Sequence, residues 1–303
     1  MDSISLITAF FNIGRERFKA IPRDDDTYLE NFKFWSRLKN YLVVYTDSYT
    51  AKKVMGIREL YGLKDKTKVV IIDDIGLIEP EILQKMKSVR NDSWFERFRI
   101  LPNATSNIPE YSYLMLLKNW FLADAVKNHY VKGQIAWIDF GFNHGGDLYT
   151  KSEEFDFEWR YKFEDKITLF YYERLDTKPI YEMVRRLCDS IMGCLYVLPD
   201  YYCEKLWQLS RHAMQTLLEV GLYDDDQLLL LMAYRTDPDK FCMIKSEWFL
   251  PIKEFGGYHL TVRHSGKRAW YKQLIVDFLI KQKKIKLAWR NARITFMDLA
   301  FKE

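Results

Sequence analysis

The sequence lacks the signatures of several common classes of protein. Its four cysteines form no C-x-x-C pair and have no histidine cluster beside them, which disfavours a zinc site. No stretch approaches the ~18 consecutive apolar residues that a membrane helix needs. The opening residues also lack the basic segment of a signal peptide. We therefore expect a cytoplasmic protein whose thiols are reduced.

Glycine-rich phosphate-binding motifs are also missing. The first strand-like run, residues 5–11 (SLITAFF), leads into Asn12 without the G-x-G-x-x-G that dehydrogenases use to bind dinucleotides. The G-x-x-x-x-G-K-[ST] loop of many ATPases and kinases is absent as well. The net charge of +4 is mild for a protein that binds nucleic acid, so no nucleic-acid partner is expected.

The chain does contain a core-forming composition and an alternation of strand-like and helix-like segments. Hydrophobic residues make up 48% of the chain and aromatic residues 16%, enough for one large α/β domain. Apolar strand-like runs alternate with segments of helical periodicity, which favours a mostly parallel sheet flanked by helices. Strands are expected at 5–11, 41–45, 68–72, 135–138, 167–172 and 191–198, helices at 28–39, 50–61, 80–90, 112–128, 201–220 and 228–234, and irregular structure at 237–270.

Three of the first four strand-like runs end directly in aspartate, at Asp47, Asp73 and Asp139. In open α/β sheets ligands bind at the C-terminal ends of the strands, so these carboxylates are predicted to lie on the functional edge. Aspartate also follows strands because it starts turns and caps helices. For any one of these residues, that structural role is at least an equal alternative.

Asp139 differs from the other two because it opens the segment Asp139-Phe140-Gly141 at the end of a buried run. A carboxylate there can hold Mn²⁺ or Mg²⁺ against a diphosphate, since these cations favour oxygen ligands and substrate phosphates. Gly141 would let the backbone approach a ligand closely. The loop after the first strand carries an aromatic residue and Arg15, which suit a base and its phosphates.

An acidic run, Asp224-Asp225-Asp226-Gln227, stands before a predicted helix. Acidic residues in that place cap a helix and complement its dipole. The functional alternative is that Asp225 or Asp226 acts as a general base on an acceptor hydroxyl, while Gln227 contacts the transferred sugar.

A second segment whose side chains could take part in the chemistry is 263–270 (RHSGKRAW). His264 is a candidate metal ligand, and Lys267 can neutralise a departing diphosphate. In glycosyl transfer the nucleotide diphosphate leaves with negative charge, which cations and basic side chains stabilise as it develops.

The order of these features resembles that of the GT-A glycosyltransferases. The residues within these motifs are most similar to those of the HtrL/YibB-like bacterial proteins, which look like glycosyltransferases of lipopolysaccharide and related surface glycans. The runs I-T-A-F-F-N-I-G-R and W-I-D-F-G-F carry most of the resemblance, which covers about residues 3–270. It implies a GT-A fold, a nucleotide-sugar donor, expected to be UDP-linked, and a glycan or glycolipid acceptor such as lipopolysaccharide, lipooligosaccharide or capsule.

The resemblance also implies places for individual residues. The GT-A pattern holds a divalent cation, usually Mn²⁺, on a D-x-D motif, and Gly141 replaces the second acid here. A metal on Asp139 therefore needs another ligand, for which His264 is the candidate, and metal-independent transfer stays open. The remaining implied contacts are Thr8, Ala9 and Phe10 around the nucleotide, Thr46 and Asp47 near the base or ribose, Lys118 beside the nucleotide, Gly193 at the acceptor and Lys267 at the diphosphate.

The sequence thus predicts a glycosyltransferase domain over residues 1–270, followed by a basic, amphipathic helical extension over 271–303. The extension interleaves basic and apolar residues, which suits docking at the anionic inner face of a membrane. The stereochemistry stays open, because an inverting enzyme would use Asp225 or Asp226 and a retaining enzyme Gln227 with the donor phosphate. Two other readings are a metal-dependent phosphohydrolase and a sugar-nucleotide-binding protein without catalysis.

Overall fold

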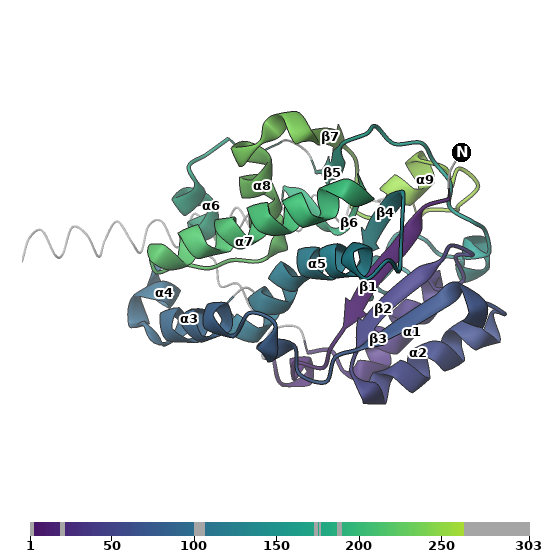
Figure 1. Ribbon diagram of the computed structural model, residues 1–303, viewed down its shortest axis with the longest axis horizontal. Coiled ribbons are helices and arrows are strands. Elements are labelled where there is room, and N and C mark those ends of the chain that lie inside the picture. The colour runs from purple at the N-terminus through teal and green to yellow at the C-terminus, as the bar shows by residue number, and fades with distance from the viewer. Residues whose placement is uncertain are drawn as a thin grey trace, which may run out of the picture.

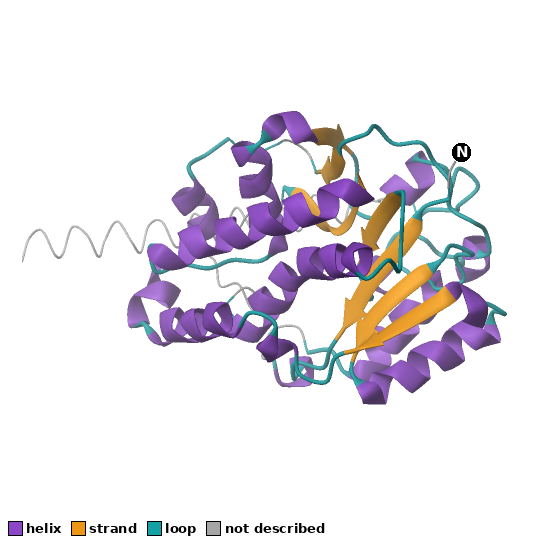
Figure 2. Ribbon diagram, in the orientation of Figure 1, coloured by secondary structure: helices purple, strands orange, loops and turns teal. Residues whose placement is uncertain are grey.

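A central sheet lies between two layers of helices in the computed structural model (Figures 1 and 2). This arrangement confirms the expected α/β fold with a mostly parallel sheet. The structure describes residues 3–18, 22–99, 107–172, 175, 177–186 and 190–263.

The observed elements follow the predicted alternation closely in the first half of the chain. The strands are β1 (Ser5–Phe10), β2 (Leu42–Thr46), β3 (Thr67–Ile71), β4 (Gln134–Ile138), β5 (Ile167–Tyr171), β6 (Ile191–Pro199) and β7 (Phe241–Lys245). The helices are α1 (Asp25–Trp35), α2 (Ser48–Leu60), α3 (Pro80–Asn91), α4 (Ser93–Phe98), α5 (Pro109–Lys127), α6 (Ile180–Arg186), α7 (Cys203–Glu219), α8 (Asp226–Thr236) and α9 (Pro251–Glu254).

The strands are arranged in the order β3-β2-β1-β4-β6-β5-β7. Strands β1 to β4 run parallel to one another, and β5 and β7 also pair in parallel. Strand β6 runs antiparallel to both of its neighbours, β4 and β5. Its N-terminal end therefore lies at the edge where β4 ends, and Leu195 of β6 pairs with Ile138 of β4.

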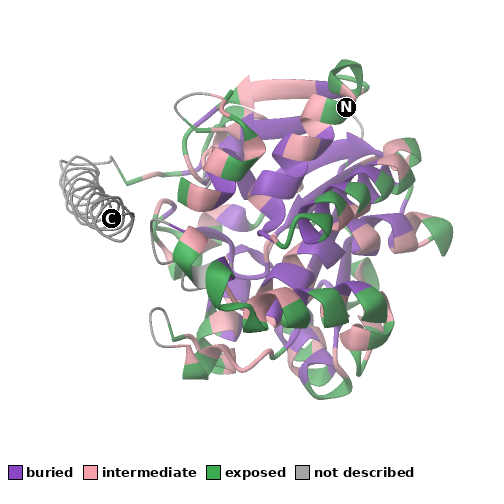
Figure 3. Ribbon diagram, turned by 90° about the vertical axis from the view of Figure 1, so that its left-hand side faces the viewer, coloured by how far each residue is buried: buried purple, intermediate pink, exposed green. Residues whose placement is uncertain are grey.

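Side chains of each central strand alternate between two hydrophobic cores, one on each face of the sheet. Ile7 of β1 belongs to the core that α5, α7 and α8 cover, whereas Leu6 and Phe10 belong to the core beneath α1 and α2. Figure 3 shows the consequence, with buried residues along the strands and exposed residues on the outer helix surfaces. The sheet is thus a rigid platform buried on both faces, as a parallel sheet requires.

Aspartates begin two of the helices on the α1–α2 face. The Asp24 side chain accepts a hydrogen bond from the Thr27 backbone N–H at 2.8 Å, and Asp47 accepts one from Thr50 N–H at 2.8 Å. Each satisfies a backbone donor that the helix leaves unpaired at its start. The capping alternative for Asp47 is therefore what the structure shows.

The second half of the chain departs from the expectation in two regions, the first of which is the unpredicted helix α6. Residues 237–270 were expected to be irregular, yet they contain the edge strand β7 and the short helix α9. Among the described residues strand β7 pairs with β5 alone, and an edge strand of five residues carries little periodic signal of its own. The predicted extension 271–303 lies outside the described residues. No helix in the described ranges has the length and apolarity needed to cross a bilayer.

Candidate functional site

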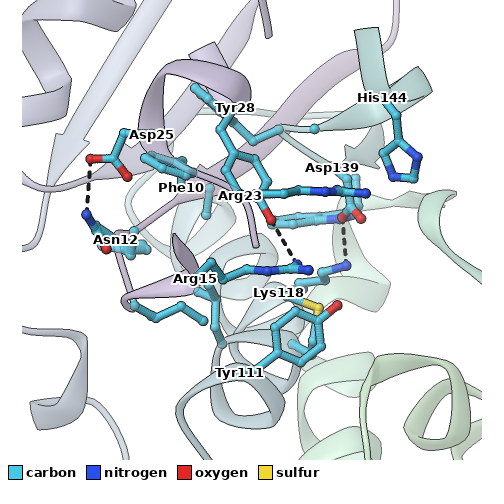
Figure 4. A pocket seen from close by; sticks show the side chains of 18 residues that line it. Phe10, Asn12, Arg15, Arg23, Asp25, Tyr28, Tyr111, Lys118, Asp139 and His144 are labelled. Carbon is cyan, nitrogen blue, oxygen red and sulfur yellow. Dashed lines mark hydrogen bonds and ion pairs between the residues drawn. The ribbon is translucent and has the colours of Figure 1, made fainter. Parts of the chain in front are cut away.

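A pocket opens at the edge of the sheet where β1 and β4 end (Figure 4). Residues from Ala9 to Ile13 line it on the β1 side, and Asp139, Phe140 and Gly141 line it on the β4 side. In open α/β sheets, ligands bind outside the C-terminal ends of the strands, where connections leave in opposite directions. Its cavity volume is about 140 Å³, comparable to a cavity that holds one benzene-sized ring, so a larger ligand would also extend through its mouth.

A buried lysine forms the floor of this pocket. The Lys118 ammonium nitrogen lies 2.6 Å from Asp139 Oδ1 and 2.6 Å from Asp226 Oδ2. It also donates to the Gly193 carbonyl at 3.1 Å. The ammonium group therefore has acceptors for all three of its hydrogens. The lysine stands on α5, and its three acceptors come from the residue after β4, from α8 and from the reversed strand β6.

Burial and charge act against each other in this cluster. Burial alone would lower the pKa of Lys118, but the adjacent Asp139 and Asp226 carboxylates outweigh it and hold that pKa well above its ordinary value. For Asp226, burial and the nearby Asp139 charge raise the pKa against the attraction of Lys118. Lys118 is therefore charged at neutral pH, and the cluster is a paired ionic group rather than a free base.

Asp139 faces the pocket in a fixed orientation. Its Oδ1 accepts from Lys118 and also from the Trp137 indole N–H at 2.7 Å, while its backbone N–H donates to the Cys194 carbonyl at 2.9 Å. The side chain is still 32% exposed, and Oδ2 has no partner among the described residues. That oxygen is available to a ligand, and the other holds the carboxylate in place.

Gly193 makes room for the Asp226 carboxylate. A Cβ atom on residue 193 would lie 2.1 Å from Oδ2 and 2.5 Å from the carboxyl carbon of Asp226. The glycine is required by space and not by its backbone conformation. Gly193 therefore acts behind the pocket, through Asp226 and Lys118, and does not line it.

Aromatic rings and two arginines form a wall of the pocket. Arg15 donates from Nη1 to the Tyr28 hydroxyl at 2.8 Å, and its guanidinium carbon lies 5.2 Å from the centre of the Tyr111 ring. The guanidinium of Arg23 lies 5.9 Å from the centre of the Tyr28 ring. Figure 4 shows both arginines reaching toward the side of the pocket that holds Asp139 and Lys118. This wall suits an anionic ligand that also carries a ring.

The loop after β4 has an unusual backbone. Asn143 and His144 both have positive φ angles, 60° and 44°, and Gly145 follows at 72°. Two successive non-glycine residues in this region store strain, which clusters at ligand sites. The loop is held by Asn143, whose side chain bonds the backbone of Leu148 and Tyr149. It places His144 at the pocket, with Nδ1 at 2.9 Å from Asp147 Oδ2.

The structure brings together most of the residues predicted for the donor site. Ala9, Phe10, Arg15, Lys118, Asp139 and Gly141 all line the one pocket. Three others lie elsewhere. Thr8 is fully buried and faces the α1–α2 core, and Thr46 is fully buried with its hydroxyl donating to the Phe10 carbonyl. Asp47 caps α2. Their positions are structural, because both threonines are fully buried and Thr8 lies inside β1, two residues before Phe10 at its end.

The acidic run 224–227 lies at the start of α8 and does not line the pocket, where a general base was predicted. Asp226 is the first residue of α8, only 5% exposed and bonded to Lys118, so it lies behind the pocket. Asp224 is buried in an ion pair with Arg99, and Asp225 occupies the N-cap position. Gln227 does not line the pocket. None of the four is among the residues that line the pocket.

Two predicted residues, His264 and Lys267, lie outside the described residues. Arg23, Tyr28, Tyr111 and His144 line the pocket although no motif in the sequence predicts them there. A local signal for Tyr28 was available, since it stands on the first turn of an amphipathic helix that follows a strand-end loop. The others have no spacing motif that would single them out.

The described residues fit a divalent cation poorly. No group of three or more histidine, cysteine, aspartate or glutamate side chains in them is placed to hold a metal ion. Asp139 contributes one available oxygen, and the Lys118 ammonium adjoins its other oxygen. Mn²⁺ and Mg²⁺ favour several oxygen ligands and no adjacent cation. The described residues therefore do not supply a full set of ligands for such a cation.

Comparisons with known proteins place the chain in a bacterial family. A family model described as "Bacterial protein of unknown function (HtrL_YibB)" matches residues 2–256. Protein HtrL of Escherichia coli (strain K12) is 26% identical over 266 residues, which cover 82% of this chain and 90% of that protein. The crystal structure of apo mouse xyloside xylosyltransferase 1 matches 80% of this chain and 85% of its own, with a TM-score of 0.40 and 14% identity.

Proposed function

We propose that this chain, which belongs to the HtrL_YibB family of bacterial proteins of unknown function, transfers a sugar from a nucleotide-sugar to an acceptor hydroxyl. The observation that carries the proposal is that two unlike kinds of group line one pocket. A fixed carboxylate, Asp139, faces the cavity, and Arg15 and Arg23 line it together with aromatic rings. A nucleotide-sugar has matching parts, with hydroxyls for the carboxylate and a diphosphate for the arginines.

The floor of the pocket has a positioning role in this proposal. Lys118 and Trp137 both donate to Asp139 Oδ1, which leaves Oδ2 to accept a hydrogen bond from a sugar hydroxyl. A carboxylate held by two donors keeps its orientation when the ligand arrives, so little reorganisation accompanies binding. Asp226 also helps to hold Asp139 in place, because it balances the charge of Lys118 on the side away from the pocket.

The transfer itself breaks the bond between the anomeric carbon and the phosphate oxygen. The electron pair stays on the departing nucleoside diphosphate, the acceptor hydroxyl oxygen bonds the anomeric carbon, and the hydroxyl proton is released. Arg15 and Arg23 are placed to neutralise the charge that develops on the diphosphate. Asp225 and Asp226 are not proposed as the base, since both are buried and neither lines the pocket.

A uridine nucleotide and a surface-glycan acceptor are the finer parts of the proposal. They rest on the family resemblance of the sequence and not on a contact in the pocket. A cytoplasmic location, with the extension 271–303 at the inner face of a membrane, likewise stays a prediction. The rival phosphohydrolase would need clustered carboxylates, and the described residues contain no such metal-holding cluster.

The test is a panel of nucleotide-sugars, with release of free nucleotide as the readout. At least one donor should bind and be turned over slowly to the nucleoside diphosphate. Asp139→Asn keeps the volume of the side chain but removes the charge and replaces one acceptor oxygen by an NH2 donor, and it should lower turnover by at least about a hundredfold. Asp73→Asn is the matched control, because Asp73 also follows a strand at this edge but lies outside the pocket.

Tight binding of a donor without turnover, even with glycan acceptors present, would identify a sugar-nucleotide-binding protein instead. Failure of every donor to bind would overturn the proposal altogether.

A further inference from the structure

We propose that Arg15 and Arg23 bind the donor diphosphate directly and take the place of a divalent cation in this pocket. The inference rests on the proposed function, because the diphosphate belongs to the nucleotide-sugar donor. Three observations carry it, and each concerns the space or the charge next to Asp139.

The first observation is that Tyr28 occupies the space a second carboxylate would need. A Cβ atom on Gly141 would lie 3.2 Å from Cε1 and 3.3 Å from Cδ1 of the Tyr28 ring, closer than ordinary van der Waals contact. Gly141 has a φ of −87°, so its backbone does not call for glycine. It is the Tyr28 ring that crowds this position, and the ring would have to shift by a few tenths of an ångström to admit a side chain at position 141.

The second observation is that the same tyrosine organises two guanidinium groups. Its hydroxyl accepts from Arg15 at 2.8 Å, and its ring lies 6.0 Å from the Arg15 guanidinium carbon and 5.9 Å from that of Arg23. The backbone N–H of Arg23 also donates to the Arg15 carbonyl at 3.3 Å, which ties the two segments together. Positive charge thus stands beside the position where a metal-holding pair of carboxylates would supply negative charge.

The third observation concerns Asp139. One of its oxygens already accepts from the Lys118 ammonium at 2.6 Å and from the Trp137 indole. A divalent cation on the other oxygen would lie within a few ångströms of that ammonium, at a cost that grows in a partly buried site. A hydroxyl of the donor meets no such repulsion.

Guanidinium groups are suited to the task that the metal would otherwise perform. Their planar donors match phosphate oxygens in pairs, and they remain charged at every physiological pH. Two of them can neutralise the charge of the leaving diphosphate while the Tyr28 and Tyr111 rings hold their planes.

Calorimetric titration of the full chain with UDP, GDP and ADP tests the proposal without any turnover. Each titration is run in EDTA and again with Mn²⁺ or Mg²⁺. The nucleotide that binds should do so with the same affinity, within about twofold, in both conditions. Arg15→Met and Arg23→Met should each weaken it about 10- to 100-fold. Arg17→Met is the matched control, since Arg17 lies on the same short helical turn with its side chain 85% exposed, and should leave affinity unchanged.

The outcomes separate the two proposals. Binding that requires Mn²⁺ or Mg²⁺ and disappears in EDTA would overturn the arginine proposal and leave the glycosyltransferase proposal standing. Equal affinities for the Arg15, Arg23 and Arg17 variants would overturn it as well. No binding of any nucleotide in either condition would count against the proposed function itself. Urea unfolding of each variant shows whether it is folded, and if Arg15→Met is not, Arg23→Met alone decides.

Discussion

A Cβ atom on Gly193 would lie 2.1 Å from Oδ2 of Asp226. The Asp226 carboxylate can therefore occupy its position only because residue 193 is glycine. Gly193→Ala should displace the carboxylate, weaken its ion pair with Lys118, and destabilise the protein by about 1–3 kcal/mol through overpacking. Turnover should fall with it, because Lys118 also orients Asp139.

The control for that variant is Gly56→Ala on α2, where a Cβ atom meets nothing within 4 Å. That change should raise stability by about 0.5–1 kcal/mol, since alanine favours an exposed helix interior. Urea unfolding of both variants checks the difference. A Gly193→Ala protein as stable and active as the parent would show that the Asp226 position is not critical.

Lys118→Met should be the most destabilising single change at the floor of the pocket. It leaves the buried Asp226 carboxylate without its cation, and breaking a buried pair in this way costs about 3–5 kcal/mol. The double variant Lys118→Met/Asp226→Asn should be less destabilised than the sum of its single variants, because the uncompensated charge is gone. Thermodynamic cycles from urea unfolding measure the coupling. Strict additivity would contradict the ion pair.

Acidification should destabilise the protein partly through His144. Burial, and then repulsion from Arg23, lowers the pKa of this imidazole despite the attraction of Asp147 and Asp139. Because the folded-state pKa lies below that of the unfolded chain, about 6.5, the folded protein binds fewer protons. The His144 contribution is therefore present above pH about 6.5 and is lost as the pH falls through the folded-state value.

Unfolding midpoints measured between pH 7.5 and 5.5 test this sign. His144→Asn should flatten the decline, since asparagine tolerates the positive φ of 44° and does not titrate. His212→Gln is the control, because His212 lies exposed on α7, and should leave the decline unchanged. An equally steep decline in His144→Asn would remove His144 as the cause.

The strands of the sheet could be predicted from the sequence because each buried strand is a short run of apolar residues. The direction of a strand and its neighbours in the sheet depend on distant residues, so nothing in the run 191–198 indicates that β6 is antiparallel. That reversal is what brings Gly193 beside Asp139 and Lys118. Asp139 was found because it ends a central strand. Arg23 and Tyr28 were not, since their role depends on the fold of the loop after β1.

The partner of Asp226 could not be predicted from the sequence either. Its place in an acidic run before a helix predicted either a cap or a base, and the structure makes it the first residue of α8, paired with a lysine 108 positions earlier. No local pattern encodes a partner so far away in the chain. Thr8 and Thr46 were misplaced for a related reason, since their side chains are fully buried and do not line the pocket.

The most direct test of the central claim is a crystal structure of the full chain with the nucleotide-sugar that binds most tightly in the panel. The diphosphate should lie within hydrogen-bond distance of Arg15 and Arg23, and a hydroxyl of the sugar should donate to Asp139 Oδ2. A donor bound away from the ends of β1 and β4, or bound there with its sugar out of reach of Asp139, would contradict the account.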